Sequence, residues 1–355
     1  MKKIKLAVIF GGESSEYPVS LHSTGSFLHS IHALKYDIVC IGITREGKWY
    51  TYSGDIASIE DDTWWQHESC EEVTLSSSKA YKGFLKLKKD GSYELIEVDC
   101  IFPVLHGKNG EDGTIQGLFE LIGIPYVGCG HMSSSICMDK EMTHIVCENA
   151  NIVCSPYFCV YQQPKMDYDT LFEHAKQELG LPIFIKPANA GSSFGISKIQ
   201  TLEEFIKGLE DAFLHDGKGK VILEKTIEGF EIGCSIMGNQ TLTVGSVDEV
   251  ETSAAFFDYQ GKYEMLNSCI HCPARISKEL IKEAQEIAQK VYRALNCKGL
   301  ARIDMFVTPN EEIILNEVNT IPGFTSTSRY PSMMKEVGIS FADLIDALIA
   351  FALES

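Results

Sequence analysis

The stretch ARIDMFVTPNEEIILNEVNTIPG, residues 301–323, constrains the fold of this chain more than any other. Two short apolar runs rich in β-branched residues flank a turn signal, Thr308-Pro309-Asn310. This pattern predicts a β-hairpin. We place the centre of the hairpin between Asn310 and Glu311, which fixes every cross-strand pair. Because side chains alternate between the two faces of a strand, the register also fixes which residues share a face.

The predicted register brings four polar residues onto one face of the hairpin. Asp304 falls opposite Glu317, and Arg302 falls opposite Asn319, whereas the other face is mainly apolar. Directly opposed carboxylates destabilise a strand pair unless a cation lies between them. Oxygen ligands without histidine or cysteine favour Mg²⁺, which commonly takes one or two carboxylates together with substrate phosphates. A charged face in contact with solvent is the alternative interpretation.

Length and charge limit the classes of protein. A chain of 355 residues is long enough for two or three domains. Its net charge of −18 argues against a nucleic-acid-binding protein, which needs a basic face. The apolar run Leu6–Phe10 is too short for a signal peptide, and no segment reaches the roughly 20 apolar residues of a membrane span. We therefore expect a cytoplasmic protein that binds neither nucleic acid nor membranes.

The twelve cysteines are expected to be reduced and mostly buried, as is usual in a cytoplasmic protein. Cys269 and Cys272 form a CxxC motif, but no second pair follows at the spacing of a zinc site. We interpret both as structural residues.

Strand and helix signals divide the chain into three units. Residues 1–129 carry a parallel α/β pattern, in which ligands gather at the carboxyl ends of the strands. Residues 130–227 and 228–355 mix both kinds of element, and residues 45–96 give no clear pattern. The expected strands are Lys5–Phe10, Asp37–Ile43, Cys100–Leu105, Pro125–Gly128, Pro182–Lys186, Lys220–Glu224 and Glu231–Met237. The expected helices are Val19–Ala33, Thr114–Ile122, Asp139–Asn149, Leu202–Phe213 and two that follow the N-caps Ser277 and Ser340.

A lysine followed by a Gly/Ser-rich loop, KPANAGSSFG, begins at Lys186. Gly191 and Gly195 permit backbone conformations that turn successive N–H groups towards one anion. Ser192 and Ser193 add hydroxyl donors. The loop matches neither the Walker A nor the GxGxxG pattern, so a phosphate-binding loop and an ordinary turn both remain open.

Acidic residues and a histidine stand at other strand ends. Glu224 and Glu231 flank a strand junction, where their carboxylates could accept hydrogen bonds from an adenine amino group or ribose hydroxyls, or merely make a linker polar. Glu16 and His106 lie in loops at the same edge of the predicted parallel sheet. We expect Glu16 to bind an ammonium group and His106 to contact the substrate, with a structural histidine as the alternative.

Seven motifs occur in the order found in D-alanine–D-alanine ligases and the related vancomycin-resistance ligases. They are GGESSEYPVSL, VLHGKNGEDG, MDKEMT, IKPANAGSSFGISK, FFDYQGKY, ARIDMF and NEVNTIPGFTSTSRYP. The chain resembles this family of the ATP-grasp superfamily over nearly its whole length. The resemblance implies an α/β ATP-grasp fold, with a Rossmann-like N-terminal domain and two α+β domains that enclose ATP. It also implies that ATP activates a first D-alanine as an acyl phosphate, which the amine of a second D-amino acid attacks.

The resemblance also implies roles for the residues that hold the nucleotide. Lys140 and Lys186 match the lysines that bind the ATP phosphates, and Ser193 lies in the ATP-binding loop. Glu224 and Glu231 match the adenine and ribose contacts. The magnesium ligands of the family, which hold two ions and also accept Mn²⁺, correspond to Asp304, Glu317 and Asn319. Members of the family are commonly homodimers.

Further residues match the groups that bind the first substrate. Glu16 resembles the residue that binds the ammonium of the first D-alanine, and Ser192 and Tyr263 resemble its hydrogen-bonded partners. Arg302 and the Gly323 N–H resemble the donors that stabilise the tetrahedral oxyanion. The chain departs from the family at Tyr17-Pro18, where many members have histidine followed by an acidic residue, and this leaves the start of the first helix open.

The second substrate determines the product. Lys262 and Ser328 match contacts to its carboxylate, and the loop keeps Lys262-Tyr263 instead of the histidine of D-lactate-forming members. Arg329 stands where ordinary D-alanine–D-alanine ligases usually carry an apolar residue. A donor dedicated to a hydroxyl discriminates strongly, so we predict a D-alanine–D-serine ligase, with the D-alanine–D-alanine reaction as the alternative. A non-catalytic ATP-binding protein would have no use for Glu16 or Arg302.

Overall fold

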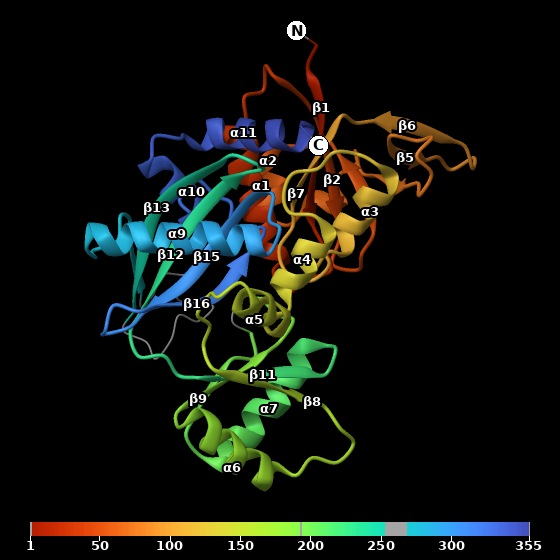
Figure 1. Ribbon diagram of the computed structural model, residues 1–355. Helices are drawn as coiled ribbons and strands as arrows, with labels where there is room; N and C mark the ends of the chain where they lie inside the picture. Colours follow the sequence, from red (N-terminus) through yellow and green to blue (C-terminus); the bar gives the residue numbers. More distant parts are fainter. Residues whose placement is uncertain (1, 192–193, 253–267, 355) are drawn as a thin grey trace.

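The computed structural model describes residues 2–191, 194–252 and 268–354. Three β-sheets with flanking helices make up this part of the chain (Figure 1). Ser192, Ser193, Lys262 and Tyr263, which the sequence places in the site, lie outside the described residues. No helix among those described is long and apolar enough to cross a membrane.

The N-terminal sheet has seven strands in the order β6-β5-β4-β3-β2-β1-β7. β1 (Ile4–Gly11) lies between β2 (Tyr36–Ile43) and β7 (Cys100–Val104) and is parallel to both, as predicted. The antiparallel extension of the sheet consists of β3 (Trp49–Tyr52), β4 (Glu71–Leu75), β5 (Gly83–Leu87) and β6 (Tyr93–Glu97). Strands of four or five residues are too short to show a periodic pattern, which is why residues 45–96 looked irregular. The predicted strand Pro125–Gly128 is wrong: Tyr126 makes only an isolated bridge to Ile101.

Alternating residues of β1 pack against different helices. Leu6 and Val8 join the core cluster that contains Phe27 of α1 (Tyr17–Ser30) and the buried face of α11 (Phe341–Leu353). Ala7 and Ile9 join the cluster of α3 (Thr114–Ile122). The helices that follow β1 and β7 thus cover opposite faces, so the loops after these strands diverge at a crossover point, where α/β sheets bind ligands. Short helices α2 (Ile56–Glu60) and η1 (Trp64–Gln66) complete this region, whereas Cys137 of α4 (His131–Met138) packs in the core of the C-terminal sheet.

The central sheet is antiparallel and has the order β10-β9-β11-β8. Its strands are β8 (Tyr157–Tyr161), β9 (Ile183–Pro187), β10 (Ser197–Ile199) and β11 (Lys220–Lys225). Helices α6 (Tyr168–Leu179) and α7 (Leu202–Asp216) bury Phe172 and Phe205 against one face. α7 begins with a capping box between Thr201 and Glu204. α5 (Lys140–Asn149) joins this sheet to the rest of the molecule (Figure 1).

The C-terminal sheet is also antiparallel, in the order β14-β13-β12-β15-β16. Its strands are β12 (Phe230–Gly238), β13 (Leu242–Thr252), β14 (Ser268–His271), β15 (Gly299–Val307) and β16 (Ile313–Asn319). The apolar side of α9 (Lys278–Ala294) packs against Ile303 and Met305 on one face. α10 (Arg329–Glu336) begins over the other face, where its first residue contacts side chains of β12 and β13.

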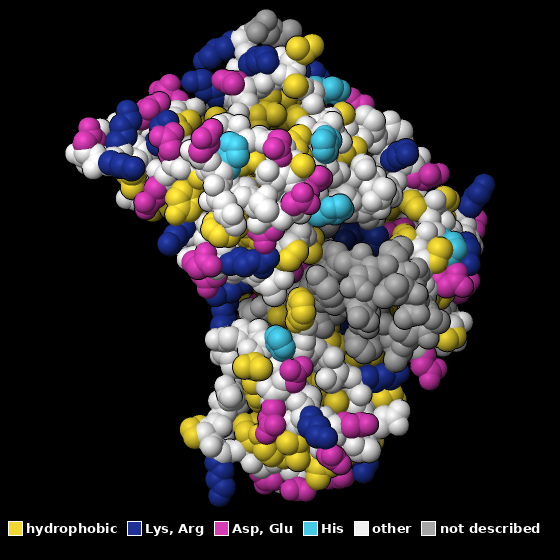
Figure 2. All heavy atoms as spheres, turned by 180° about the vertical axis from the view of Figure 1, so that it is seen from behind, with side chains coloured by type: hydrophobic (Ala, Val, Ile, Leu, Met, Phe, Trp, Pro, Cys, Tyr) yellow, Lys and Arg dark blue, Asp and Glu magenta, His cyan; other side chains and the backbone are white. Residues whose placement is uncertain are grey.

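Charged side chains are spread over the surface. Acidic and basic residues intermingle on the face seen in Figure 2. All twelve cysteines are free thiols, including Cys269 and Cys272 of the CxxC motif.

Candidate active site

Four neighbouring strands of the C-terminal sheet place one residue each in a single row. Asp248 on β13 pairs with Gly233 on β12, Gly233 pairs with Asp304 on β15, and Asp304 pairs with Glu317 on β16. Directly paired residues point to the same face of a sheet. Three carboxylates therefore share one face, and the predicted pairing of Asp304 with Glu317 is confirmed.

The turn of this hairpin differs from the prediction. The Thr308 N–H donates to the Glu312 carbonyl at 3.0 Å, and the Glu311 N–H donates to the Thr308 carbonyl at 2.9 Å. The hairpin is therefore centred on Asn310, half a residue away from the predicted centre. Glu311 takes the left-handed conformation, with φ of 62°, that ends a loop of this type.

A β-bulge restores the predicted register beyond the turn. Met305 pairs with Leu315, whereas Arg302 pairs with Asn319, so the register shifts by one residue between these pairs. Asn316 is the extra residue, and an inserted residue of this kind bends the strand and redirects side chains. Without the bulge, Asn316 and Val318 would face the site in place of Glu317 and Asn319, because a shift of one residue exchanges the two faces.

The charge of the buried Asp304 is balanced by guanidinium groups. The Nε and Nη2 atoms of Arg302 donate to the two carboxylate oxygens at 2.8 and 2.7 Å, and the Asn319 amide donates at 2.9 Å. Arg329 Nη2 lies 3.7 Å from Asp304 Oδ1. The protein itself thus supplies positive charge at Asp304, and a metal ion between the facing carboxylates stays a prediction. The oxygen atoms of Asp304, Glu317 and Asn319 nevertheless form a donor set that suits Mg²⁺.

Arg329 links three strands of the site face. Its Nε and Nη2 atoms each donate to Asp248 at 2.8 Å, and Nη1 donates to Glu231 at 2.7 Å. Asp248 is completely buried, so its charge depends on this bidentate pair. Gly233 leaves the space that the pair needs, because a Cβ atom there would lie 2.5 Å from Arg329 Nη2 and 2.7 Å from Asp248 Oδ1.

The segment before α10 holds Ser328 close to Gly323. Ser328 is the N-cap of α10, but its hydroxyl accepts a hydrogen bond from the Thr325 N–H at 3.1 Å instead of capping the helix. A Cβ atom at Gly323 would lie 3.3 Å from Ser328 Oγ. Two residues predicted to contact substrate are therefore neighbours beside the carboxylate row.

A second buried cluster lies between the central sheet and β16. Lys186 Nζ lies 2.5 Å from Glu224 Oε2 and donates to the Asn316 side chain at 3.3 Å, so the bulge reaches the central sheet. Lys140 Nζ donates to the Ala190 carbonyl at 2.8 Å, in the Gly/Ser-rich loop. Two buried lysines thus converge near that loop, and their charges fit a polyphosphate.

The pKa of Glu224 reflects this surplus of positive charge. Burial alone would raise it, but the charges of Lys186 and Lys140 hold it below its ordinary value. The carboxylate is therefore ionised at neutral pH. His144 Nε2 lies 3.4 Å from Glu224 Oε1.

Glu16 is buried at the start of α1, where the N-terminal loops meet the Gly/Ser-rich loop. A Cβ atom at Gly107 would lie 2.1 Å from Glu16 Oε2, and one at Gly191 would lie 3.0 Å from the same atom. The side chain of Glu16 therefore fills a space bounded by the backbones of two glycines. The three segments that were predicted to surround the first substrate are in contact.

His106 does not extend freely into this space. Its Nδ1 atom lies 3.1 Å from the Ile321 carbonyl and its Nε2 atom lies 3.1 Å from Ser23 Oγ, and the side chain is buried. Burial lowers the pKa of His106 to about 4, so the ring is neutral near pH 7. It donates through Nδ1 to the carbonyl, which ties the N-terminal sheet to the segment after β16.

Glu111 makes a second tie between the same segments. Its carboxylate accepts from the Gly107 N–H at 2.7 Å and from the Ile321 N–H at 3.1 Å. Burial and the nearby charge of Glu16 raise the pKa of Glu111 to about 8. Two acidic side chains therefore share one buried region beside the candidate site.

The departure at Tyr17-Pro18 is accommodated without disturbing Glu16. α1 begins at Tyr17, and Pro18 lies in its first turn, where a missing N–H costs nothing. The Tyr17 hydroxyl donates to Asp62 at 2.8 Å and accepts from the Trp64 indole at 3.0 Å. Tyr17 thus anchors the helix start to Asp62 and Trp64.

Comparisons with known proteins agree with this geometry. The family models "D-ala D-ala ligase N-terminus" and "D-ala D-ala ligase C-terminus" match residues 5–129 and 146–350. The chain belongs to the D-alanine–D-alanine ligase family. It is therefore an ATP-dependent ligase of the D-alanine–D-X type, in which X is the second substrate.

Relatives of this ligase include both resistance enzymes and ordinary ones. The crystal structure of the VanG D-Ala:D-Ser ligase from Enterococcus faecalis is 47% identical, with a TM-score of 0.90, over 99% of this chain and 100% of that one. The vancomycin C-type resistance protein VanC1 of Enterococcus gallinarum is 43% identical over 99% of this chain and 98% of its own. The D-alanine–D-alanine ligase of Caldicellulosiruptor bescii is 42% identical over 100% of this chain and 96% of its own.

Sequence reasoning missed four residues of the ligase that shape the site. The sequence did contain a signal for Asp248, because an acidic residue among the valines of β13 needs a charged partner if it is buried. Glu111 was part of a motif but received no role. Gly233 and Asn316 gave no signal, since a missing side chain and a bulge both acquire meaning only beside the neighbouring strands.

Proposed function

We propose that this ligase joins D-alanine to D-serine, and so makes an altered peptidoglycan precursor of the kind associated with vancomycin resistance. The observation that carries the proposal is the buried Arg329–Asp248 pair in the carboxylate row. D-serine differs from D-alanine by one hydroxyl, so a preference for D-serine needs a polar group held near the second-substrate pocket. Arg329 lies next in sequence to Ser328, a predicted contact of that pocket.

The chemistry of the pair suits a hydroxyl. A guanidinium carries five N–H bonds, and three of those of Arg329 are directed at Asp248 and Glu231. The remaining bonds can donate to a hydroxyl oxygen, while Asp248 fixes the orientation of the group. A site built around such donors disfavours an analogue that lacks the hydroxyl, because the polar atoms of the site then have no hydrogen-bond partner. The similarity to the VanG D-Ala:D-Ser ligase supports the same choice.

We also propose which residues would bind the nucleotide and the metal ions. Lys140 and Lys186 would hold the ATP phosphates, and Glu224 would accept from the nucleobase. Glu231, predicted as a ribose contact, already accepts a hydrogen bond from Arg329 Nη1. A ribose hydroxyl would have to share its carboxylate with that arginine. Ser193 stays a prediction for the ATP loop.

Asp304, Glu317 and Asn319 would hold two Mg²⁺ ions, or Mn²⁺ in their place. A bound divalent ion supplies positive charge that neutralises phosphate oxygens. Arg302 donates to Asp304 across the same face and so fixes the orientation of one carboxylate. The oxygen-only donor set and the burial of Asp304 support this assignment.

The first D-alanine would bind near the N-terminal loops. Glu16 would take its ammonium, and His106 would support the substrate through the segment that it ties to the sheet. Arg302 and the Gly323 N–H would stabilise the oxyanion, each contributing about 3–4 kcal/mol as positioned donors do. Ser192, Tyr263 and Lys262 keep the roles that the family resemblance implies, and they lie outside the described residues.

D-alanine–D-alanine ligation is the second candidate. The ion pairs of Arg329 favour this candidate, because they would also account for the arginine if its role were only to link α10 to β13. The ordinary ligase of Caldicellulosiruptor bescii is nearly as similar as the resistance proteins. Product identity separates the two reactions.

The test is a mixed-substrate incubation. The ligase is given ATP, Mg²⁺ and D-alanine, with D-serine, further D-alanine or D-lactate added in turn, and the products are identified by mass spectrometry. We expect D-alanyl-D-serine as the main product at neutral pH. An equal or greater yield of the D-alanine dimer from equal concentrations would overturn the D-serine assignment.

Three broader assignments are part of the proposal. The division into residues 1–129, 130–227 and 228–355 follows the grouping of the three sheets.

A homodimer in the cytoplasm, where ATP and D-amino acids are available, is the expected working form. Size-exclusion chromatography with light scattering would test the dimer.

A further inference from the structure

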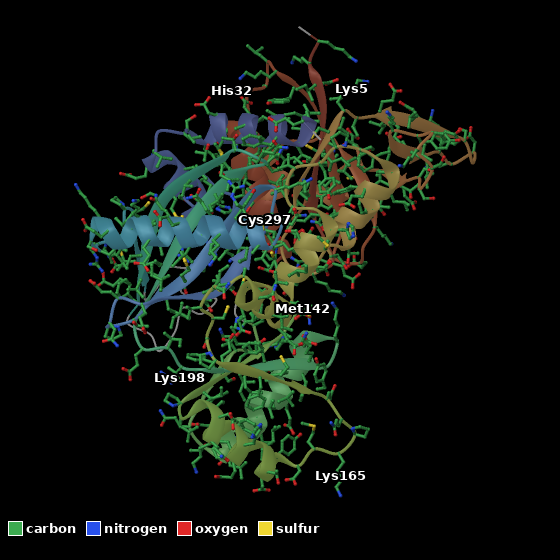
Figure 3. The ribbon with its side chains drawn as sticks, in the orientation of Figure 1. Lys5, His32, Met142, Lys165, Lys198 and Cys297 are labelled. Carbon is green, nitrogen blue, oxygen red and sulfur yellow. The ribbon has the colours of Figure 1, made fainter. Side chains whose placement is uncertain are left out.

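His144 is a buried histidine on α5 to which none of the proposed roles applies. It lies one helical turn after Lys140, on the same side of the helix, and its side chain is completely buried. Met142, on another side of α5, is partly exposed at the junction between the central sheet and the rest of the molecule (Figure 3). The buried side of α5 therefore carries both a phosphate-lysine candidate and an imidazole.

The polar atoms of this imidazole are unsatisfied in the part of the chain that the structure describes. Neither Nδ1 nor Nε2 makes a hydrogen bond of good geometry there, although the backbone of Asn316 interacts with the ring. The ring stands edge-on to Tyr157, with ring centroids 4.6 Å apart and an interplanar angle of 89°. Nε2 approaches Glu224 Oε1 to 3.4 Å, outside hydrogen-bonding geometry. A buried polar group left in this state costs stability and needs a functional or structural reason.

The groups around the ring favour its neutral form. Lys140 on α5 and Lys186 on β9 are positive neighbours, Glu224 on β11 is a negative neighbour, and Tyr157 on β8 is uncharged. Burial, together with the two lysines, lowers the pKa of His144, although the charge of Glu224 and the backbone of Asn316 both act to raise it. A neutral imidazole offers one N–H donor and one acceptor.

The two oxygens of Glu224 therefore face different partners. Oε2 lies 2.5 Å from Lys186 Nζ, and Oε1 lies 3.4 Å from His144 Nε2. A small rotation of the carboxylate or the ring would convert the second contact into a hydrogen bond. A carboxylate held at both oxygens cannot rotate, and its remaining lone pairs keep a fixed direction.

We propose that His144 is a positioning residue that orients Glu224 and thereby sets the preference for a purine with a 6-amino group over one with a 6-oxo group. The proposal rests on the proposed contact of Glu224 with the nucleobase. An amino group donates to the oriented carboxylate, whereas a carbonyl oxygen at the same place would meet another acceptor. If Glu224 could rotate towards Lys186, this discrimination would weaken.

The test compares the binding of ATP and ITP, each as its magnesium complex, by calorimetry without D-amino acids. Wild-type protein is expected to bind ATP more tightly. His144→Phe keeps the ring shape but removes both nitrogens, and should raise the Kd for ATP by about tenfold while changing the Kd for ITP less than about twofold. His144→Gln supplies an amide N–H and should recover most of the preference. An ATP-to-ITP ratio that is unchanged in His144→Phe overturns the proposal.

Two controls separate this role from a structural one. Tyr157→Phe keeps the ring contact and loses only a hydroxyl, so its ATP-to-ITP ratio should match that of the wild type. Thermal unfolding of each nucleotide-free variant reports stability; a lower Tm in His144→Phe with the wild-type ratio would show a structural histidine and refute the proposal. Failure of the underlying assignment looks different, because the wild type itself would then show no preference for ATP over ITP.

Discussion

Arg329, the first residue of α10, forms a bidentate ion pair with Asp248 of β13, with both N–O distances at 2.8 Å. The two residues are 81 positions apart in the sequence. Asp248 is completely buried, so the pair joins a helix start to the middle of the C-terminal sheet and leaves a charged group beside Asp304.

Removal of one partner is expected to be more damaging than removal of both. Arg329→Leu leaves Asp248 buried without its partner and should lower the free energy of unfolding by about 3–5 kcal/mol. Asp248→Leu combined with Arg329→Leu removes both charges of the pair and should recover part of this loss, since Glu231 still lacks its arginine. The double variant should nevertheless use D-serine less well relative to D-alanine, by about tenfold or more in the ratio of kcat/KM, since the hydroxyl donor is gone.

A neighbouring pair supplies the control. Arg275 binds Glu249, the residue after Asp248, but its side chain is half exposed. Arg275→Leu should therefore cost at most about 1 kcal/mol and leave the D-serine preference unchanged. A double variant of Asp248 and Arg329 with wild-type substrate preference would contradict the assigned role of the pair.

Gly233→Ala tests whether the ion pair needs the missing side chain. The new Cβ atom would meet Arg329 Nη2 at 2.5 Å and Asp248 Oδ1 at 2.7 Å, so the pair must separate. We expect a loss of about 1–3 kcal/mol in the free energy of unfolding and a weaker D-serine preference, measured by urea denaturation and product analysis. Gly117→Ala is the matched control, because a Cβ atom on that helical residue meets nothing within 4 Å. It should stabilise the protein by about 0.5–1 kcal/mol; equal destabilisation by both substitutions would refute the steric argument.

Glu111 should make stability depend on pH in an unusual direction. Burial and the charge of Glu16 raise its pKa from an ordinary value of 4.5 to about 8. The folded state then binds a proton that the unfolded state releases, so this contribution to stability is complete below pH 4.5 and is lost as the pH rises towards 8. Urea denaturation between pH 5 and pH 9 should show the free energy of unfolding falling over this window.

Glu111→Gln removes the titrating group while keeping one carbonyl oxygen to accept a backbone N–H. Its absolute stability should be lower, because the amide cannot accept from both Gly107 and Ile321. Its pH dependence over the same window should be flatter than that of the wild type. Parallel curves for the two proteins would show that Glu111 is not the group responsible.

Asp346 of α11 should stabilise the contact between the first and last parts of the chain. It accepts from His32 Nδ1 at 2.7 Å, Lys35 Nζ at 2.5 Å and the Tyr36 hydroxyl at 2.6 Å. Asp346→Asn removes the charge that attracts these donors and should lower the free energy of unfolding by about 1–2 kcal/mol. Asp343→Asn, one turn earlier, is the control, since the side chain of Asp343 bonds only to Ser340 among the described residues. A loss for Asp346→Asn no larger than for the control would rule out the inter-segment contact as a source of stability.

Local pattern was enough to predict much of the hairpin but not its construction. The alternation of apolar and acidic residues placed Asp304 and Glu317 on one face, because that alternation follows from strand geometry alone. The prediction reached the observed pairing through a turn centre that was wrong by half a residue. The bulge at Asn316 cancels this error, and a bulge has no reliable signal in a single strand.

By itself, the sequence determined the order of strands and helices around the site, the polar face of the last hairpin and the acidic and basic residues available to it. These features depend on side-chain periodicity, caps and turn residues that are close together in the chain. Only the tertiary structure decided which charges meet. The pairing of Arg329 with Asp248, the space at Gly233 and the placement of His144 beside Glu224 all arise where separate strands and helices pack together, and distances between such segments are not written in any local pattern.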